Sequence, residues 1–213
     1  FVSKSIQLRK IEKDPSYKYY VRGLFLKLFG GLSVCFIYTY YYGGGDTLGY
    51  YNDSSLVADL FLRDPIKALQ YTFNTQPEMW DWFDDSTGYP FYLNDAHAIV
   101  VVKLSWVLCL LSFKSYLGMT LLLAWISFFP IWRFYQALIK EFPELSTQFA
   151  YALLGIPSVF FWGSGLLKDT ITFSAVCLFA SSYSIILIEK RSYFYNTFLI
   201  LIASALLIMI KCF

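Results

Sequence analysis

Long apolar runs alternate with short polar spacers through most of this chain. The first run, LFLKLFGGLSVCFIYTYYY at residues 24–42, is long enough to cross a hydrocarbon core of about 30 Å at a helical rise of about 1.5 Å per residue. Further apolar runs follow at residues 98–113, 117–139, 147–167, 170–188 and 193–210. The pattern predicts an all-α fold, a polytopic bundle of transmembrane helices.

The pattern changes between residues 43 and 97, where polar positions interrupt the apolar ones. Pro65 divides this stretch, because a proline cannot donate the backbone hydrogen bond that would continue a helix. We therefore expect two short amphipathic helices that lie along the membrane surface, within the first exterior loop. The apolar positions at helical spacing are Leu56, Val57, Leu60, Phe61, Ile66, Leu69 and Phe73.

The amino-acid composition indicates what surrounds these helices. The chain is 57% hydrophobic and only 15% charged, whereas soluble domains average about 45–50% apolar and about 25% charged residues. A core of this size cannot bury such an excess, so lipid must surround much of the surface. We expect a multi-pass protein of the cell inner membrane.

Charges are sorted by region. Residues 1–23 are basic, and Lys27 is interpreted as a further cation in the first turn of the first span, which by the positive-inside rule predicts a cytoplasmic N-terminus. Residues 43–97 carry nine carboxylates against two cations, and we expect them to form the exterior loop. Residues 24–213 are interpreted as the membrane domain, truncated at its C-terminus because the chain stops near the end of an apolar run.

The run at residues 98–113 is a marginal span of sixteen residues with Lys103 near its centre. If it crosses the membrane fully, Arg133 and Lys140 fall on the exterior side, against the positive-inside rule. If it is re-entrant or interfacial, both become cytoplasmic and Lys168 lies on the side of the acidic loop. We favour the second arrangement and keep the full crossing as the alternative.

The stretch YTYYYGGGDTLGYYND, residues 38–53, is the first candidate site. Its three glycines permit a sharp turn as the chain leaves the bilayer. That turn would hold Asp46 near the membrane surface, partly desolvated by tyrosines that include Tyr50, where a carboxylate can accept a proton from an attacking hydroxyl. The alternative is structural: Asp46 caps the N-terminus of a surface helix.

The second candidate is PSVFFWGSGLLKDTITF, residues 157–173. Pro157 and two glycines interrupt an apolar helix, and Lys168 and Asp169 then appear between two spans. Lys168 beside a helix N-terminus would offer a phosphate both its ammonium charge and the helix dipole. The alternative is a snorkelling lysine followed by a capping aspartate.

The third candidate is PEMWDWFDDSTGYP in the acidic loop. Asp81, Asp84 and Asp85 are candidate oxygen ligands for a divalent cation, although their spacing matches no established metal loop and solvated carboxylates are the alternative. Trp80 and Trp82 either stack on a sugar ring or anchor the loop at the membrane interface.

Together, GGGDTLGYYND, the paired surface helices and PSVFFWGSGLLKD resemble the GT-C superfamily of membrane glycosyltransferases over roughly residues 24–191. The resemblance implies that Asp46 is the catalytic or substrate-binding aspartate of the first exterior loop. It also implies that Lys168 meets the phosphate of a lipid-linked donor. The family usually has two adjacent acids in this loop, whereas GDT has one, which leaves metal dependence and the identity of the base open.

The expected activity is transfer of a sugar from a polyprenyl-phosphate-linked donor to an acceptor at the exterior face. Asp46 would be catalytic, and the substrate would contact Lys168, Asp169, Asp81, Trp80, Trp82 and Tyr50. The expected partners are the lipid-linked sugar donor, membrane lipid and a candidate membrane protein partner, with no nucleic acid. The alternatives are a polysaccharide polymerase of the O-antigen or exopolysaccharide kind and a non-catalytic membrane subunit that binds a partner through its aromatic loop.

Overall fold

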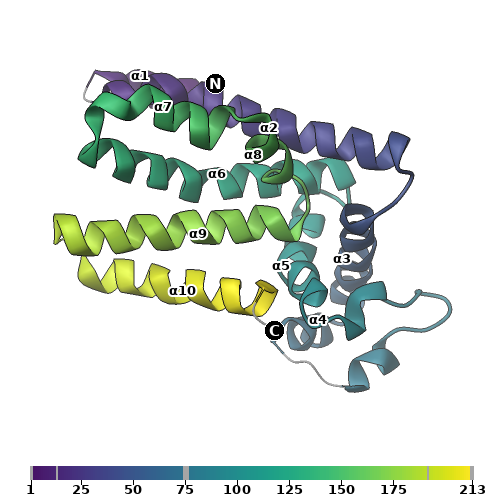
Figure 1. Ribbon diagram of the computed structural model, residues 1–213. Helices are drawn as coiled ribbons and strands as arrows, with labels where there is room; N and C mark the ends of the chain where they lie inside the picture. Colours follow the sequence, from purple (N-terminus) through teal and green to yellow (C-terminus); the bar gives the residue numbers. More distant parts are fainter. Residues whose placement is uncertain (1, 13, 74–76, 191, 212–213) are drawn as a thin grey trace.

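The computed structural model describes residues 2–12, 14–73, 77–190 and 192–211, and each regular element in these ranges is helical (Figure 1). The expected all-α fold is confirmed. The helices form two parts. One is a bundle of long helices, and the other is a layer of shorter helices across one end of that bundle.

Four helices of the described residues are long and apolar enough to cross a membrane, so this is a membrane protein. They are built on α2 (Tyr20–Phe36), α6 (Tyr116–Glu141), α9 (Lys168–Ser184) and α10 (Tyr193–Lys211). A 3₁₀ turn, Pro15–Tyr19, precedes α2, and π-helical turns, Ile37–Tyr41 and Ile185–Glu189, extend α2 and α9. The candidate spans are Pro15–Tyr41, Tyr116–Glu141, Lys168–Glu189 and Tyr193–Ile210.

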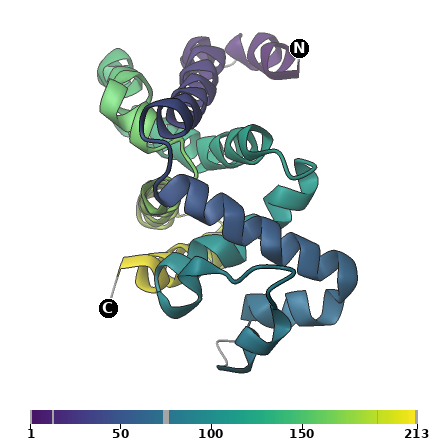
Figure 2. The same cartoon turned by 90° about the vertical axis from the view of Figure 1, so that its right-hand side faces the viewer.

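The second part, which we call the end layer, contains the two helices expected in the first loop. They are α3 (Asp46–Arg63) and α4 (Pro65–Phe73), and α4 begins at Pro65 as the sequence predicts. Packed against α3 is α5 (Ala98–Leu111), with the 3₁₀ turns η3 (Pro77–Trp82) and η4 (Phe91–Asn94) beside them. Figure 2 shows α3 running across the ends of the bundle helices. With the bundle axes along the membrane normal, these helices lie parallel to the membrane surface.

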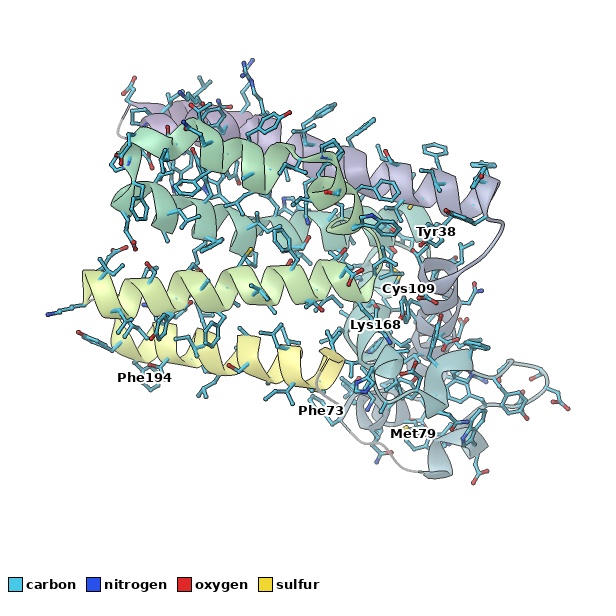
Figure 3. All side chains as sticks on the ribbon, viewed as in Figure 1. Tyr38, Phe73, Met79, Cys109, Lys168 and Phe194 are labelled. Atoms are coloured by element: carbon cyan, nitrogen blue, oxygen red, sulfur yellow. The ribbon has the colours of Figure 1, made fainter. Side chains whose placement is uncertain are left out.

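The position of α5 bears on the question of residues 98–113. This helix has only 14 residues and packs on α3 in the end layer rather than between the long helices. It therefore matches the interfacial interpretation. Consistently, Lys140 pairs with Glu189 at 2.8 Å at one end of the bundle, whereas Lys168 lies at the other end, 3.8 Å from Asp95. Figure 3 labels Lys168 and Phe194 at these opposite ends.

Residues 147–167 are expected as a span interrupted from Pro157 onward; the interruption is confirmed, but the segment is not among the four candidate spans of the described residues. The chain forms η5 (Pro143–Leu145), α7 (Ser146–Ala150), a π-helical turn (Tyr151–Gly155) and α8 (Pro157–Trp162). Ile156 is extended, with φ −68° and ψ 124°, because the ring of Pro157 disfavours a helical conformation in the residue before it. We call residues 146–167 the broken segment.

Lys27 is also placed differently from the expectation. The first candidate span is Pro15–Tyr41, so Lys27 lies near its middle rather than in its first turn. Its side chain is only 4% exposed, and its ammonium donates a hydrogen bond to the carbonyl of Gly163, just after α8 ends. Before the span, α1 (Val2–Ile11) folds back beside the start of α2 (Figure 1).

Close packing joins α2 to the broken segment. A methyl group on Gly30 would lie 2.1 Å from the carbonyl oxygen of Phe160, so only glycine permits this approach of two backbones. Farther toward the N-terminal end, Tyr20 packs edge-on against Phe128 and Trp132, with ring centroids 5.4 and 5.0 Å apart. Such aromatic pairs contribute about 0.5–1.5 kcal/mol each beyond their buried area.

We expect Gly30→Ala to lower the stability of the folded protein by roughly 1–3 kcal/mol, because two backbones must move apart to admit the methyl group. Thermal unfolding in detergent measures this effect. Gly44→Ala is the matched control, since nothing lies within 4 Å of a methyl group at that position. Equal midpoints for the two variants would contradict the described contact between α2 and α8.

Candidate functional site

The candidate site is built on one face of α3. This helix follows the glycine-rich turn by which the chain leaves the bundle for the first time. Gly43 and Gly45 adopt positive φ angles of 62° and 112°, as the glycine-rich turn predicts. The N-cap residue of α3 is Gly45, so the interpretation of Asp46 as the cap is wrong. Asp46 instead occupies the first turn of α3, where it shares a face with Tyr50 and Asp53 at helical spacing.

Asp53 fixes the loop that faces α3. Its side chain is 2% exposed, and its two carboxylate oxygens accept hydrogen bonds from the backbone N–H groups of Phe91, at 2.9 Å, and Tyr92, at 2.8 Å. Burial raises the pKa of Asp53, against the opposing effect of these two donors. Sequence reasoning did not single out Asp53; the available signal was a carboxylate in line with the buried positions Tyr50 and Val57.

Tyr92 connects Asp53 to Asp46. Its ring stacks on Tyr50, with centroids 4.7 Å apart, and approaches the backbone of Gly49 so closely that a methyl group there would lie 2.8 Å from it. The Tyr92 hydroxyl donates a hydrogen bond to Asp46 at 3.0 Å. Burial and the Asp46 carboxylate both raise the pKa of Tyr92, so the phenol keeps its proton and acts as the donor.

Asp46 lines an open hollow of about 560 Å³ beside α3. Asn52 supplies an amide, and Tyr89, Phe91 and Tyr92 supply aromatic faces. Trp80 lies next to this hollow, with its ring 6.1 Å from that of Tyr89. Carboxylate, amide and aromatic faces together are suited to a polyhydroxylated ligand. The complete lining is Gly44, Gly45, Asp46, Leu48, Gly49, Asn52, Asp53, Leu56, Tyr89, Phe91 and Tyr92.

Lys168 is at the same end of the bundle, as the first residue of α9, but it does not line this hollow. Its ammonium lies 3.8 Å from Asp95, which also accepts hydrogen bonds from the N–H groups of Ala98, at 2.8 Å, and His97, at 2.9 Å. These N–H donors and Lys168 lower the pKa of Asp95.

Tyr50 is close enough to both Asp46 and Asp95 for their charges to act on its pKa. Burial is the main cause that raises the pKa of Tyr50, and the carboxylates of Asp46, Asp95 and Asp169 add to it. Tyr50, stacked on Tyr92, is therefore within electrostatic range of Asp46, Asp95 and Asp169. The structure brings Asp46, Tyr50, Lys168 and Asp169 to one region of the molecule.

The structure does not bring all the candidate residues of PEMWDWFDDSTGYP together near Asp46. Asp81, Asp84 and Asp85 are exposed, and Asp84 accepts hydrogen bonds from Ser86 and Thr87 in its own turn, which lower the pKa of Asp84. Trp82 packs against the core of the end layer. Among the described residues, no three His, Cys, Asp or Glu side chains are grouped so that they could hold a metal ion.

Comparisons with protein-family models, with curated proteins and with solved structures found no match to this chain. The function is therefore argued from the geometry of the site.

We expect Asp53→Ala to release the loop at Phe91 and Tyr92, because two N–H donors lose their acceptors. The expected cost is about 1–3 kcal/mol of stability, with faster hydrogen exchange at both amides. Asp53→Asn should be intermediate, since an amide offers one acceptor oxygen in place of two. Asp81→Ala, at an exposed position of η3, is the control. Unchanged exchange in Asp53→Ala would rule out the carboxylate as the anchor of this loop.

Proposed function

We propose that the protein is a membrane glycosyltransferase of GT-C type that acts at the face of the end layer. Its donor is a sugar linked to polyprenyl phosphate, and its acceptor is a hydroxyl group that enters the hollow beside α3. Asp46 is the base and Lys168 binds the lipid phosphate. The observation that carries the proposal is the position of Asp46, which lines an open hollow and is oriented by the Tyr92 hydroxyl.

The reaction is a displacement at the anomeric carbon of the donor sugar. The acceptor oxygen forms a bond to that carbon while its proton passes to the Asp46 carboxylate. The bond between the anomeric carbon and the phosphate oxygen breaks, and the lipid phosphate leaves with the electron pair. A single displacement of this kind inverts the anomeric configuration. General base catalysis by a positioned carboxylate contributes about 10²–10⁴-fold.

Tyr92 and Asp53 give Asp46 its orientation. The Tyr92 hydroxyl donates to one oxygen of Asp46 at 3.0 Å, and the second carboxylate oxygen is available to accept the proton. Asp53 holds the backbone of Tyr92, so the orientation of the base does not depend on the mobility of a surface loop. A base held in place in this way needs little reorganisation at the moment of reaction.

Lys168 is placed to receive the phosphate at the boundary between membrane and end layer. It begins α9, and no side chain caps this helix, so the N–H groups of its first turn add a favourable field for an anion. Its present partner, Asp95, is nearly half exposed and already bound to two backbone N–H groups, so the ion pair can open when a phosphate arrives. Trp80 and Tyr89 offer aromatic faces to the sugar.

We expect Asp46→Asn to reduce the release of polyprenyl phosphate by at least about 100-fold, because an amide cannot accept the proton. The assay supplies polyprenyl-phosphate hexoses to the purified protein together with membrane glycans as acceptors. Free polyprenyl phosphate is the product for every donor sugar, so it is the measured species. Tyr92→Phe should lower the rate less and shift its pH profile, because the base remains but loses its oriented partner.

Asp64→Asn is the control, with the same carboxylate-to-amide change at the far end of α3. It should retain the wild-type rate. Normal transfer by a folded Asp46→Asn protein would remove Asp46 from the mechanism. If the protein acts only on a donor that carries a repeat unit on a lipid diphosphate, the result favours the alternative of a polysaccharide polymerase. Lost binding of a partner protein without any transfer reaction would favour the non-catalytic subunit.

A further inference from the structure

A second polar hollow lies at the opposite end of the bundle, where Pro15–Tyr19 precedes α2. It has a volume of about 600 Å³ and is bounded by the start of the first span, α6 and the π-helical end of α9. Its lining combines donors of several kinds with two carboxylates and apolar walls. The lining residues are Asp14, Tyr17, Arg133, Gln136, Ala137, Ile139, Lys140, Ile185 and Glu189.

Arg133 is the unusual member of this set. It lies eight residues before the end of α6, about 12 Å from that end at a helical rise of about 1.5 Å per residue. Its guanidinium donates to Asn196 and lies over the ring of Tyr195, 5.7 Å from the centroid. Its Nε atom is buried and has no hydrogen-bond partner, and none of the ion pairs described within residues 14–190 includes it.

Neither carboxylate of the hollow forms a described ion pair with Arg133. Glu189 pairs with Lys140 at 2.8 Å. The Asp14 carboxylate accepts hydrogen bonds from the N–H of Ser16, at 2.9 Å, and from Gln136, at 3.5 Å. A partly buried charge without an ion-pair partner is costly, and within a membrane protein such a residue is by default a candidate binding or transport site.

We propose that this hollow binds a phosphate group through Arg133. A guanidinium presents parallel N–H donors that match two phosphate oxygens, and the unused Nε–H is one of them. Lys10 donates to the hydroxyl oxygen of Tyr17 at 3.1 Å, which leaves the phenolic proton of Tyr17 available as a further donor. The phosphate belongs either to a phospholipid headgroup at this end of the bundle or to a soluble phosphate compound.

The test uses the purified full chain in a neutral detergent and two probes. Inorganic phosphate is compared with chloride at equal ionic strength, and phosphatidylglycerol is compared with phosphatidylcholine. Ligand that binds the folded state raises the thermal midpoint. We expect one or both probes to raise the wild-type midpoint, and Arg133→Gln to weaken the affinity for the effective probe by about tenfold or more. A response to phosphatidylglycerol alone identifies the headgroup, and a response to phosphate alone identifies a soluble ligand.

Arg22→Gln is the matched control, because Arg22 is exposed near the same end and does not line this hollow. It should keep the full shift. If neither probe raises the wild-type midpoint, or if Arg22→Gln loses as much affinity as Arg133→Gln, the proposal is overturned. Should Arg133→Gln fail to fold, Arg133→Lys decides the question. It keeps the charge without the planar fork, so an affinity equal to wild type would also overturn the proposal.

Discussion

A buried lysine near the middle of the first span is the constraint on which the rest of the arrangement depends. An ammonium at this depth is expensive, and it persists only where a polar group of the protein meets it. The break that ends α8 supplies that group, because the carbonyl of Gly163 has no helical partner ahead of it and accepts from Lys27. With Gly30 against the backbone of Phe160, this contact fixes the broken segment on α2 and so determines where α9 begins.

The start of α9 in turn connects the bundle to the end layer. Lys168 is the first residue of α9 and lies beside Asp95, whose carboxylate also receives the first N–H groups of α5. A second buried group, Asp53, holds η4 against α3 and thereby places Tyr92 next to Asp46. The candidate site is therefore positioned in two ways, by the pair of Lys168 and Asp95, which joins the bundle to the end layer, and by Asp53 from within the end layer.

The features that the sequence predicts correctly are those with local causes. Pro65 separates α3 from α4, and Gly43 and Gly45 adopt positive φ angles, because both effects act within a few residues. The short apolar run at residues 98–113 likewise forms a helix too short to count among the four candidate spans. The break at Pro157 was predicted in the same way, since the residue before a proline avoids the helix, but the high apolarity of residues 147–167 led us to expect a membrane span there.

The features that sequence reasoning missed depend on partners far away in the chain. Asp53 is recognisable as an anchor only when the backbone of residues 91 and 92 is placed beside it. In the same way, the role of Lys27 is recognisable only when the carbonyl of Gly163 is placed beside its ammonium. Asp46 was predicted near the membrane surface, but its donor, Tyr92, lies 46 residues later and carried no signal of its own. An acid in an apolar stripe and a lysine inside an apolar run are the patterns that indicated such contacts.

The depth of these groups limits how a lipid-linked donor could use the site. Lys168 begins its candidate span, and Asp46 follows the end of the first candidate span by a few residues, so the proposed reaction uses groups at the ends of two spans. Between these groups and Arg133 near the other end, Lys27 is buried against protein and is not open to a ligand. In the proposed reaction the polyprenyl chain must therefore run along the outside of the bundle. Only the phosphate needs to reach Lys168 at the start of α9, and only the sugar needs to reach the open hollow beside α3.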